Sequence, residues 1–296
     1  MINLPPEGTR VSLRYRRPAG STPSLTDVVG HLIEVTPMVR VRTKRGDVVD
    51  VWPDDVVAVR VLADAPVRTG DIRNLEHAAA LAWPGVEHEW LGGWLLRFGH
   101  GSTRRANSAV PLDVSAAVDT RPIVDWYAAR ATAPLLAAPD RLFRLPPGAT
   151  ADGENVVMTA DLTAETPPET SATIESTPDD AWLDLYERDV PVDVLTAVID
   201  GDLAFGAVAG AAVGRAAVTV APDGTRWAGL SAVHVVSEER RRGVARALCT
   251  DLLTWAAHRH ATRAYVQVLP ENTAAMGLYE SMGFKAHHRS RYVSLG

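Results

Sequence analysis

Residues 9–62 contain short runs in which apolar and polar side chains alternate, which is the period of a strand with one buried face. Clusters of Pro, Gly, Ser and Asp separate these runs and are typical of turns. The runs are TRVSLRYR, DVVGHLIEV, MVRVRTKRG and DVVDVWPDDVVAVRVL. The pattern predicts four or five short strands that form a small β-barrel.

Beyond this region the pattern becomes a mixture of helical and strand periods. Helical spacing appears in DIRNLEHAAALAW and RPIVDWYAARA. Strand-like runs are GGWLLRFG, RRANSAVPL, RLFRLP and NVVMTADL. We therefore expect an α+β segment over residues 66–170, followed by a polar connection at TAETPPETSAT.

Residues 171–296 predict two strand–loop–helix units in succession. RWAGLSAVHVV predicts a strand, SEERRRG a loop, and the apolar spacing from Val244 to His258 a helix. A second strand, RAYVQVLP, precedes a helix that Asn272 is placed to cap and Gly283 to end. The first amides of a helix lack internal partners and lie at the positive end of its dipole, so the first unit predicts an anion site.

The composition is that of an ordinary globular chain of 296 residues with net charge −6, long enough for two or three domains. The one cysteine, Cys249, falls in an apolar helical pattern, which favours core packing over redox or nucleophilic chemistry. The start MINLPPEGTR does not resemble a signal peptide, and Arg215 ends the apolar run LAFGAVAGAAVG too early for a membrane span. We expect a cytoplasmic protein without a membrane partner, and the acidic balance argues against nucleic acid.

Two motifs in residues 171–296 connect this pattern to a family. RRRGVA fits R/Q-x-x-G-x-G/A, and NTAAMGLYESMGF fits N-x-x-A-x-x-L-Y-x-x-x-G-F, so this segment resembles the GCN5-related N-acetyltransferases (GNAT superfamily). Ala245 stands where a second glycine is commoner. Residues 66–170 resemble a degenerate GNAT-like half, and residues 1–65 an SH3-like domain of actinobacterial acetyltransferases. The expected fold class is α+β, a mixed central sheet with flanking helices preceded by the SH3-like β-barrel.

The resemblance implies an N-acetyltransferase with acetyl-CoA as co-substrate. The residues that would contact its phosphates and pantetheine arm are Val233, Val235, Arg240, Arg241, Arg242, Gly243, Val244, Ala245 and Asn272. Tyr279 would be the general acid that protonates the CoA thiolate, which suits an ordinary tyrosine pKa of about 10. Spacing alone would make Tyr279 an aromatic residue on a core face.

The acceptor side is less defined. Ser231 is expected to share a strand face with Val233 and Val235 and to hold a water, whereas His234 points away and is expected to be structural. The acceptor is expected to be a primary amine of a small molecule or a protein, attacked directly in a ternary complex. No metal is expected, and a homodimer stays open. Further candidate acceptor contacts are Arg104, Arg105 and Asn107.

A second class of function also stays open: a non-catalytic acyl-CoA-binding or adaptor protein that acts through the SH3-like domain. Intact RRRGVA, Asn272 and Tyr279 favour the enzyme. Residues 1–65 carry nine basic and eight acidic side chains, a balance that gives no argument for DNA binding.

Overall fold

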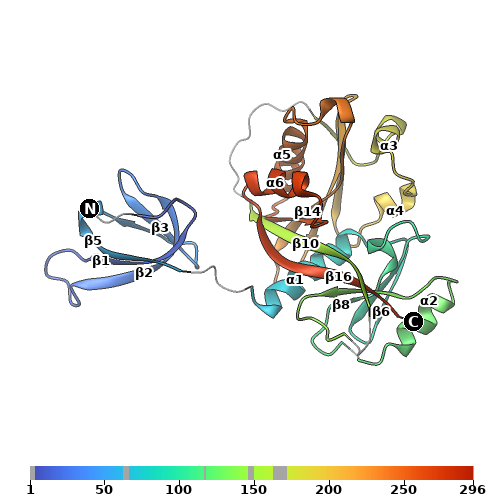
Figure 1. Ribbon diagram of the computed structural model, residues 1–296, viewed down its shortest axis with the longest axis horizontal. Helices are drawn as coiled ribbons and strands as arrows, with labels where there is room; N and C mark the ends of the chain where they lie inside the picture. Colours follow the sequence, from blue (N-terminus) through green and yellow to red (C-terminus); the bar gives the residue numbers. More distant parts are fainter. Residues whose placement is uncertain (1–3, 63–66, 117, 146–149, 163–171, 296) are drawn as a thin grey trace. The chain divides into compact units, whose positions relative to one another are not determined.

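The computed structural model describes residues 4–62, 67–116, 118–145, 150–162 and 172–295 (Figure 1). The chain forms two compact units, Met1–Pro66 and Val67–Gly296. The predicted limits at 65/66 and 170/171, and most of the tract TAETPPETSAT, lie outside the described residues. These limits therefore stay predictions.

The Met1–Pro66 unit is one antiparallel sheet of five strands in the order β4-β3-β2-β1-β5. Alternation along β1 buries Val11 and Leu13, which pack with Val39 and Val41 of β3. The period-two pattern thus predicted these strands correctly. The strands are β1 (Arg10–Arg16), β2 (Leu25–Glu34), β3 (Val39–Thr43), β4 (Val48–Val51) and β5 (Val56–Val61).

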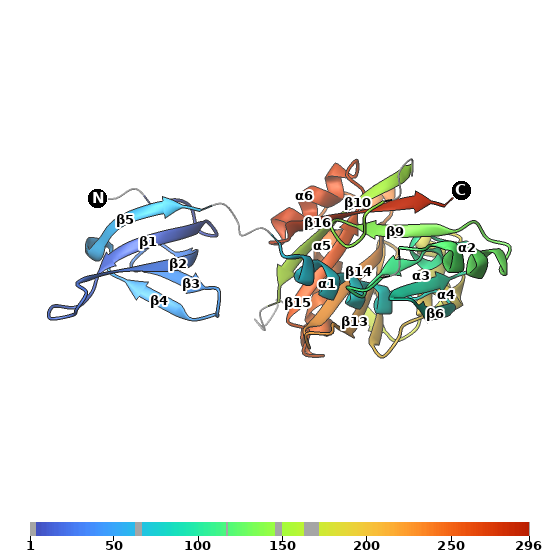
Figure 2. The same ribbon diagram turned by 90° about the horizontal axis from the view of Figure 1, so that it is seen from below.

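The Val67–Gly296 unit is built on a mixed sheet of eight strands in the order β11-β12-β13-β14-β15-β10-β16-β9, in which only β14 and β15 pair in parallel. A three-stranded sheet and α2 (Arg121–Ala128) lie at the end of this unit away from α6 (Thr273–Ser281) (Figures 1 and 2). The small sheet consists of β6 (Glu87–Leu91), β7 (Trp94–Phe98) and β8 (Val110–Pro111). The strands of the large sheet are β9 (Leu135–Pro139), β10 (Ala151–Asp161), β11 (Thr173–Glu175), β12 (Asp202–Val208), β13 (Ala212–Val220), β14 (Arg226–Val235), β15 (Arg263–Val268) and β16 (Lys285–Ser294).

Helices cover both faces of the large sheet. On one face, Leu248 and Leu252 of α5 (Val244–Ala257) pack against β12. A Cβ placed on Gly206 of β12 would fall 2.9 Å from Leu248 Cδ1. On the other face, the neighbouring residue Phe205 packs edge-on against Trp182 of α3 (Asp180–Tyr186). Adjacent strand residues therefore contact helices on opposite faces. The remaining helices are α1 (Thr69–Ala82) and α4 (Val192–Thr196).

Strand β10 joins the two segments that the sequence separated at residue 170. It belongs to the middle segment but pairs with β15 on one side and β16 on the other. Glu76 of α1 adds a second link, because its Oε1 lies 2.7 Å from Nε2 of His288 on β16 and both side chains are buried. Residues on both sides of the predicted limit thus complete one sheet.

Two predicted strands are wrong in position. RRANSAVPL begins with a 3-10 turn at Arg105–Asn107, and only Val110–Pro111 of it forms a strand. Residues 141–145 of RLFRLP follow β9 without forming a strand, and Arg141 has φ 64°. The actual strand, Leu135–Pro139, is a short apolar run with little alternation because it is buried almost throughout. None of the described helices is long and apolar enough to cross a membrane.

Candidate active site

Strands β14 and β15 pair briefly and then separate. Their parallel register joins residues 227–229 to residues 263–265, whereas β14 continues to Val235 and β15 to Val268. Past residue 229 the facing backbone N–H and C=O groups have no partner in this described register. Such an edge can take up an extended chain that carries amides.

A β-bulge in β14 decides which side chains face the opening. The register with β13 shifts between Val213 and Arg215, and Ala232 has φ 53°. Ser231 Oγ accepts a hydrogen bond from Arg215 Nη1 at 3.3 Å, while Val233 packs into the core under α5. Ser231 and Val233 therefore lie on opposite faces, and the predicted common face is wrong because alternation does not continue through a bulge.

Because of the same bulge His234 shares a face with Ser231, while it lies opposite Val233 and Val235 as predicted. Its Nε2 lies 3.6 Å from Oε2 of Glu187, the residue that follows α3. His234 is among the residues that line the cavity at the end of β14.

This cavity of about 700 Å³ lies between the end of β14, the following loop, α5 and α6. Arg242 is absent from its lining because Nη1 pairs with Oε1 of Glu239 at 2.8 Å and the side chain is 64% exposed. The predicted residues that do line it are Val233, Val235, Arg240, Arg241, Gly243, Val244, Ala245, Asn272 and Tyr279.

The loop before α5 has the geometry of an anion site. Arg241 and Gly243 have φ of 62° and 83°, and Gly243 caps the 14-residue helix. Backbone N–H groups at such a helix start bind anions. A Cβ at Gly243 would meet nothing within 4 Å, so the glycine is required by its backbone conformation rather than by lack of space.

Sequence reasoning missed Arg246, which also lines this cavity. It lies in the first turn of α5, where a cation opposes the helix dipole. A basic residue at that position was therefore a signal for an anionic ligand. Arg240, Arg241 and Arg246 make no ion pair among the described residues.

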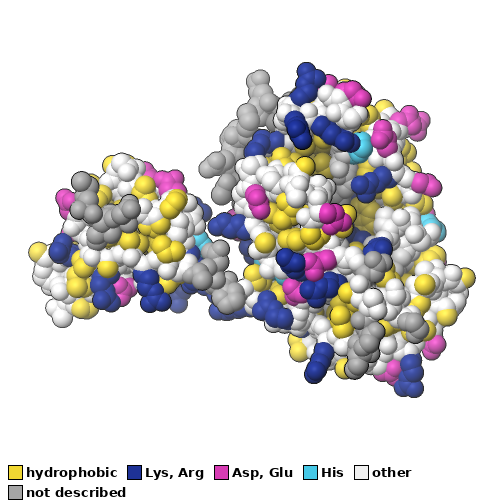
Figure 3. All heavy atoms as spheres, viewed as in Figure 1, with side chains coloured by type: hydrophobic (Ala, Val, Ile, Leu, Met, Phe, Trp, Pro, Cys, Tyr) yellow, Lys and Arg dark blue, Asp and Glu magenta, His cyan; other side chains and the backbone are white. Residues whose placement is uncertain are grey.

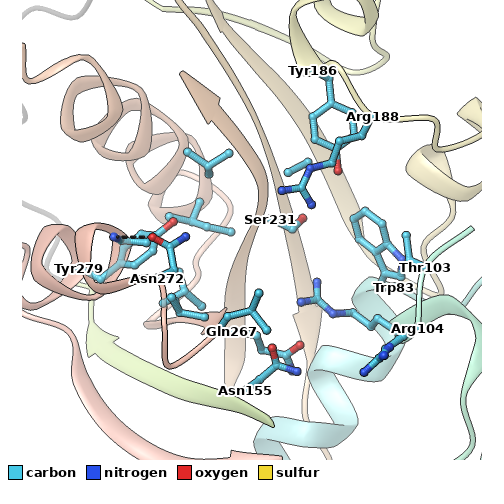
Figure 4. Close-up of a pocket in the computed structure, with 18 of the residues that line it drawn as sticks. Trp83, Thr103, Arg104, Asn155, Tyr186, Arg188, Ser231, Gln267, Asn272 and Tyr279 are labelled. Atoms are coloured by element: carbon cyan, nitrogen blue, oxygen red, sulfur yellow. Dashed lines mark hydrogen bonds between the residues drawn. The ribbon is translucent and has the colours of Figure 1, made fainter. Parts of the chain in front are cut away.

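Helix α6 has the ends that the sequence predicted. Asn272 Oδ1 accepts a hydrogen bond from the Ala275 N–H at 3.1 Å, and Gly283 follows the helix with φ 86°. The cap uses the Asn272 oxygen and leaves its amide nitrogen available to a ligand. Figure 4 shows Asn272 and Tyr279 together on one side of the opening.

Tyr279 is 7% exposed and lies in the same buried core cluster as Cys249. Burial raises the pKa of the Tyr279 hydroxyl above its ordinary value and that of the Cys249 thiol to about 12. Both groups keep their protons at neutral pH, so Tyr279 can donate a proton but cannot serve as a base. Cys249 is fully buried, which confirms its predicted place in the core.

A second cavity of about 320 Å³ occupies the opening between β14 and β15. It shares Arg188, Val233, Asn272, Ala275 and Tyr279 with the first, so the two cavities meet at these residues. Figure 4 shows Ser231 on the strand between Tyr279 on one side and Trp83 on the other.

Not all of the predicted acceptor residues line the second cavity. Ser231 and Arg105 line the second cavity, whereas Asn107 does not. Asn107 is 6% exposed, and its Oδ1 accepts hydrogen bonds from the N–H groups of Gly99 and Gly101, both at 2.9 Å. Its amide thus holds the loop before the 3-10 turn, and its predicted contact with the acceptor stays a prediction.

The fold of the chain is that of the GNAT acetyltransferases. The chain resembles a GCN5-related N-acetyltransferase from Kribbella flavida with a TM-score of 0.55 at 14% identity, over 77% of this chain and 96% of that one. A GNAT-family acetyltransferase from Novosphingobium aromaticivorans gives a TM-score of 0.51 at 20% identity, over 76% and 95% of the two chains.

The particular family follows from the sequence. Residues 69–293 match the model described as "Probable histone acetyltransferase Rv0428c C-terminal", and residues 5–60 match "Rv0428c N-terminal Sm-like domain"; the chain belongs to this family. The small N-terminal sheet is thus matched as Sm-like, and its predicted SH3-like character is not confirmed.

Two relatives carry acetyltransferase names. "Probable histone acetyltransferase Rv0428c" of Mycobacterium tuberculosis (strain ATCC 25618 / H37Rv) is 55% identical over 295 residues, 99% of this chain and 97% of that protein. "Uncharacterized N-acetyltransferase YobR" of Bacillus subtilis (strain 168) is 28% identical over 255 residues, 74% of this chain and 97% of that protein. The protein is an acetyltransferase.

Proposed function

We propose that the protein transfers the acetyl group of acetyl-CoA to a primary amine. The observation that carries this proposal is that two cavities meet at Tyr279. One has the anion-binding loop at its rim and suits a polyphosphate cofactor; the other is open to a second substrate. We call them the cofactor cavity and the acceptor cavity.

The cofactor would lie along the edge of β14. Its pyrophosphate would bind the backbone N–H groups at the start of α5, with Arg240 and Arg241 supplying countercharge. The amides of the pantetheine arm would pair with the backbone at Val233 and Val235, where β14 has left β15. This direction brings the thioester to Tyr279.

The reaction would be direct attack in a ternary complex. The amine nitrogen forms a bond to the acetyl carbon, the carbon–sulfur bond breaks, and the thiolate takes the proton of Tyr279. The amine gives a proton to solvent, because no Asp or Glu lines the acceptor cavity among the described residues. Solvent then restores the proton of Tyr279. Acetyl-CoA is a co-substrate in this scheme.

The acceptor is assigned here only as an amine. The Mycobacterium tuberculosis relative is named a histone acetyltransferase, and a lysine side chain of a protein is one such amine. The adaptor alternative would leave the acceptor cavity without a role. An SH3-like binding role for the small N-terminal sheet stays a separate proposal.

Acetyl-CoA affinity, measured by isothermal titration calorimetry, tests the proposal. Replacing Arg240 and Arg241 together by Gln should weaken binding on the order of 10- to 100-fold, since charge-assisted contacts to phosphate are lost. Arg242→Gln is the control: it removes one positive charge from the same loop but lies outside the cavity, so affinity should change by less than about twofold.

Two results would overturn the assignment of the cofactor cavity. One is a wild-type protein that does not bind acetyl-CoA. The other is an equal loss of affinity in the double variant and in Arg242→Gln, which would mean that the loop acts only through its overall charge.

A further inference from the structure

The charged side chains that line the acceptor cavity are all cationic: Arg104, Arg105 and Arg188. No acidic side chain lines it in the part of the chain that the structure describes. This composition is unusual for a site that would have to admit a cationic lysine side chain.

Arg105 is the arginine that the fold holds in place. It begins the 3-10 turn that Asn107 anchors, and its guanidinium lies 5.6 Å from the indole of Trp83. The buried Nε makes no hydrogen bond among the described residues. A guanidinium that is positioned by stacking and not neutralised by a carboxylate is suited to bidentate recognition of an oxyanion.

A second arginine lies beneath the cavity. Arg215 is 1% exposed, and its guanidinium donates to the carbonyls of Ala82, Leu195 and Ala197 and lies 4.5 Å from the indole of Trp83. Carbonyl partners satisfy its hydrogen bonds but leave its charge in place. Burial lowers the pKa of Arg215 to about 9, which keeps it cationic at neutral pH.

Ser231 connects this buried charge to the cavity. Its Oγ accepts from Arg215 Nη1 at 3.3 Å, so its hydroxyl proton is directed to another acceptor. Since Ser231 lines the acceptor cavity, that acceptor can be a bound substrate. Ser231 is thus a hydrogen-bond donor with a cation behind it.

We propose that the acceptor is a small amine that also carries an oxyanion, a carboxylate or a phosphate, which Arg105 and Ser231 bind. This inference rests on the proposed function and narrows its substrate class. The cavity of about 320 Å³ matches a small molecule. The oxyanion end would occupy the side of Trp83 and Arg105, and the amine would point across the opening to Tyr279.

The same charges disfavour a basic peptide. Placing a lysine-rich segment beside Arg105 and Arg188 costs like-charge repulsion. The amine of an anionic substrate escapes this cost, because its own oxyanion compensates the arginines.

The test uses matched amines in the full-length protein, with CoA release as the readout. The pairs are glycine and glycinamide, β-alanine and its amide, and phosphoethanolamine and ethanolamine, together with a lysine-containing basic peptide. The anionic member of at least one pair should have the higher kcat/KM, on the order of 10-fold or more. Whether the carboxylate or the phosphate pair shows the larger ratio identifies the oxyanion.

Variants then separate this inference from the proposed function. Arg105→Gln should reduce kcat/KM for the preferred anionic amine on the order of 10- to 100-fold, with little effect on its neutral partner or on the Kd of acetyl-CoA. Arg121→Gln, an exposed arginine of the same unit outside both cavities, should change neither. Preference for the neutral amines or the peptide, or no turnover of any anionic amine by a protein that binds acetyl-CoA, overturns the inference alone. Loss of acetyl-CoA binding itself would instead refute the proposed function.

Discussion

His287 is the residue at which protonation bears most directly on the fold. It lies on β16 with its Nδ1 2.8 Å from Nδ1 of His288, whose Nε2 contacts Glu76 of α1. Burial, together with the charges of His288 and Arg263, lowers the pKa of His287 from 6.5 to about 4. The folded protein therefore keeps His287 neutral where an unfolded chain would take up a proton.

The free energy of unfolding should consequently decrease as the pH is lowered from 6.5 to about 4. Because the folded-state pKa lies below the unfolded value, the unfolded state binds more protons between pH 6.5 and about 4, and the free energy of unfolding decreases as pH falls through that range. His287→Gln should have a flatter dependence, whereas the exposed His258→Gln should follow the wild type. Urea unfolding at several pH values measures this. If the free energy of unfolding depended on pH in the same way for the wild type and both variants, the explanation would be contradicted.

For single residues, the sequence predicted positions that follow from adjacent residues in the chain. It missed side-chain directions that depend on contacts made in the folded structure. The cofactor cavity gathers Gly243, Val244 and Ala245 because a loop and the first turn of a helix are continuous in sequence. The face of Ser231 depends on a bulge, and the direction of Arg242 on its pairing with Glu239. Neither has a signal in motif spacing.

Among the elements, β10 has the greatest influence on how the site is held. It pairs with β15, whose separation from β14 forms the opening, and it separates β15 from β16. Met158 of β10 is buried in the same core as Leu248 and Tyr279. A segment outside the motif-bearing region thus supports the strand that lines the acceptor cavity.

Two truncations test this role. Residues 67–296 contain the whole large sheet and should unfold cooperatively and bind acetyl-CoA. Residues 172–296 lack β9 and β10, so the edges of β15 and β16 and their apolar side chains would be exposed, and neither property should survive. Circular dichroism melts with and without acetyl-CoA provide the comparison. A shorter fragment that folds and binds would show that β10 is dispensable.

The elements themselves were only partly predictable. Helices such as α5 and α6 follow from apolar spacing with capping residues at their ends. The neighbours of β10 could not be found in this way, because it pairs with residues more than a hundred positions away. Strand pairing at that range is decided by the packed sheet and leaves no local pattern.

The whole molecule combines an acetyltransferase unit with a small five-stranded sheet that matches an Sm-like domain. Acidic and basic side chains are interspersed on the face shown in Figure 3, in keeping with a chain of net charge −6. The concentration of arginines at the two cavities is therefore a local feature. This concentration favours anion binding at the site.

Tyr279 is the residue that the proposed mechanism makes the general acid. Tyr279→Phe keeps the aromatic packing and removes only the hydroxyl, so the Kd of acetyl-CoA should stay within about twofold while kcat at pH 7 falls on the order of 10²- to 10⁴-fold. Tyr127→Phe is the control, because it removes the hydrogen bond from a buried hydroxyl to Arg97 O at 2.9 Å outside both cavities. It should lower stability without this loss of turnover.

The most direct measurement is kcat of wild type and Tyr279→Phe across pH 7 to 10, with the best amine from the matched panel. The deficit of the variant should be largest at neutral pH and should shrink as pH passes the thiol pKa of about 8.5, because the thiolate then leaves without needing a proton. Equal kcat values at pH 7, or a deficit independent of pH, would contradict the role of Tyr279 as general acid.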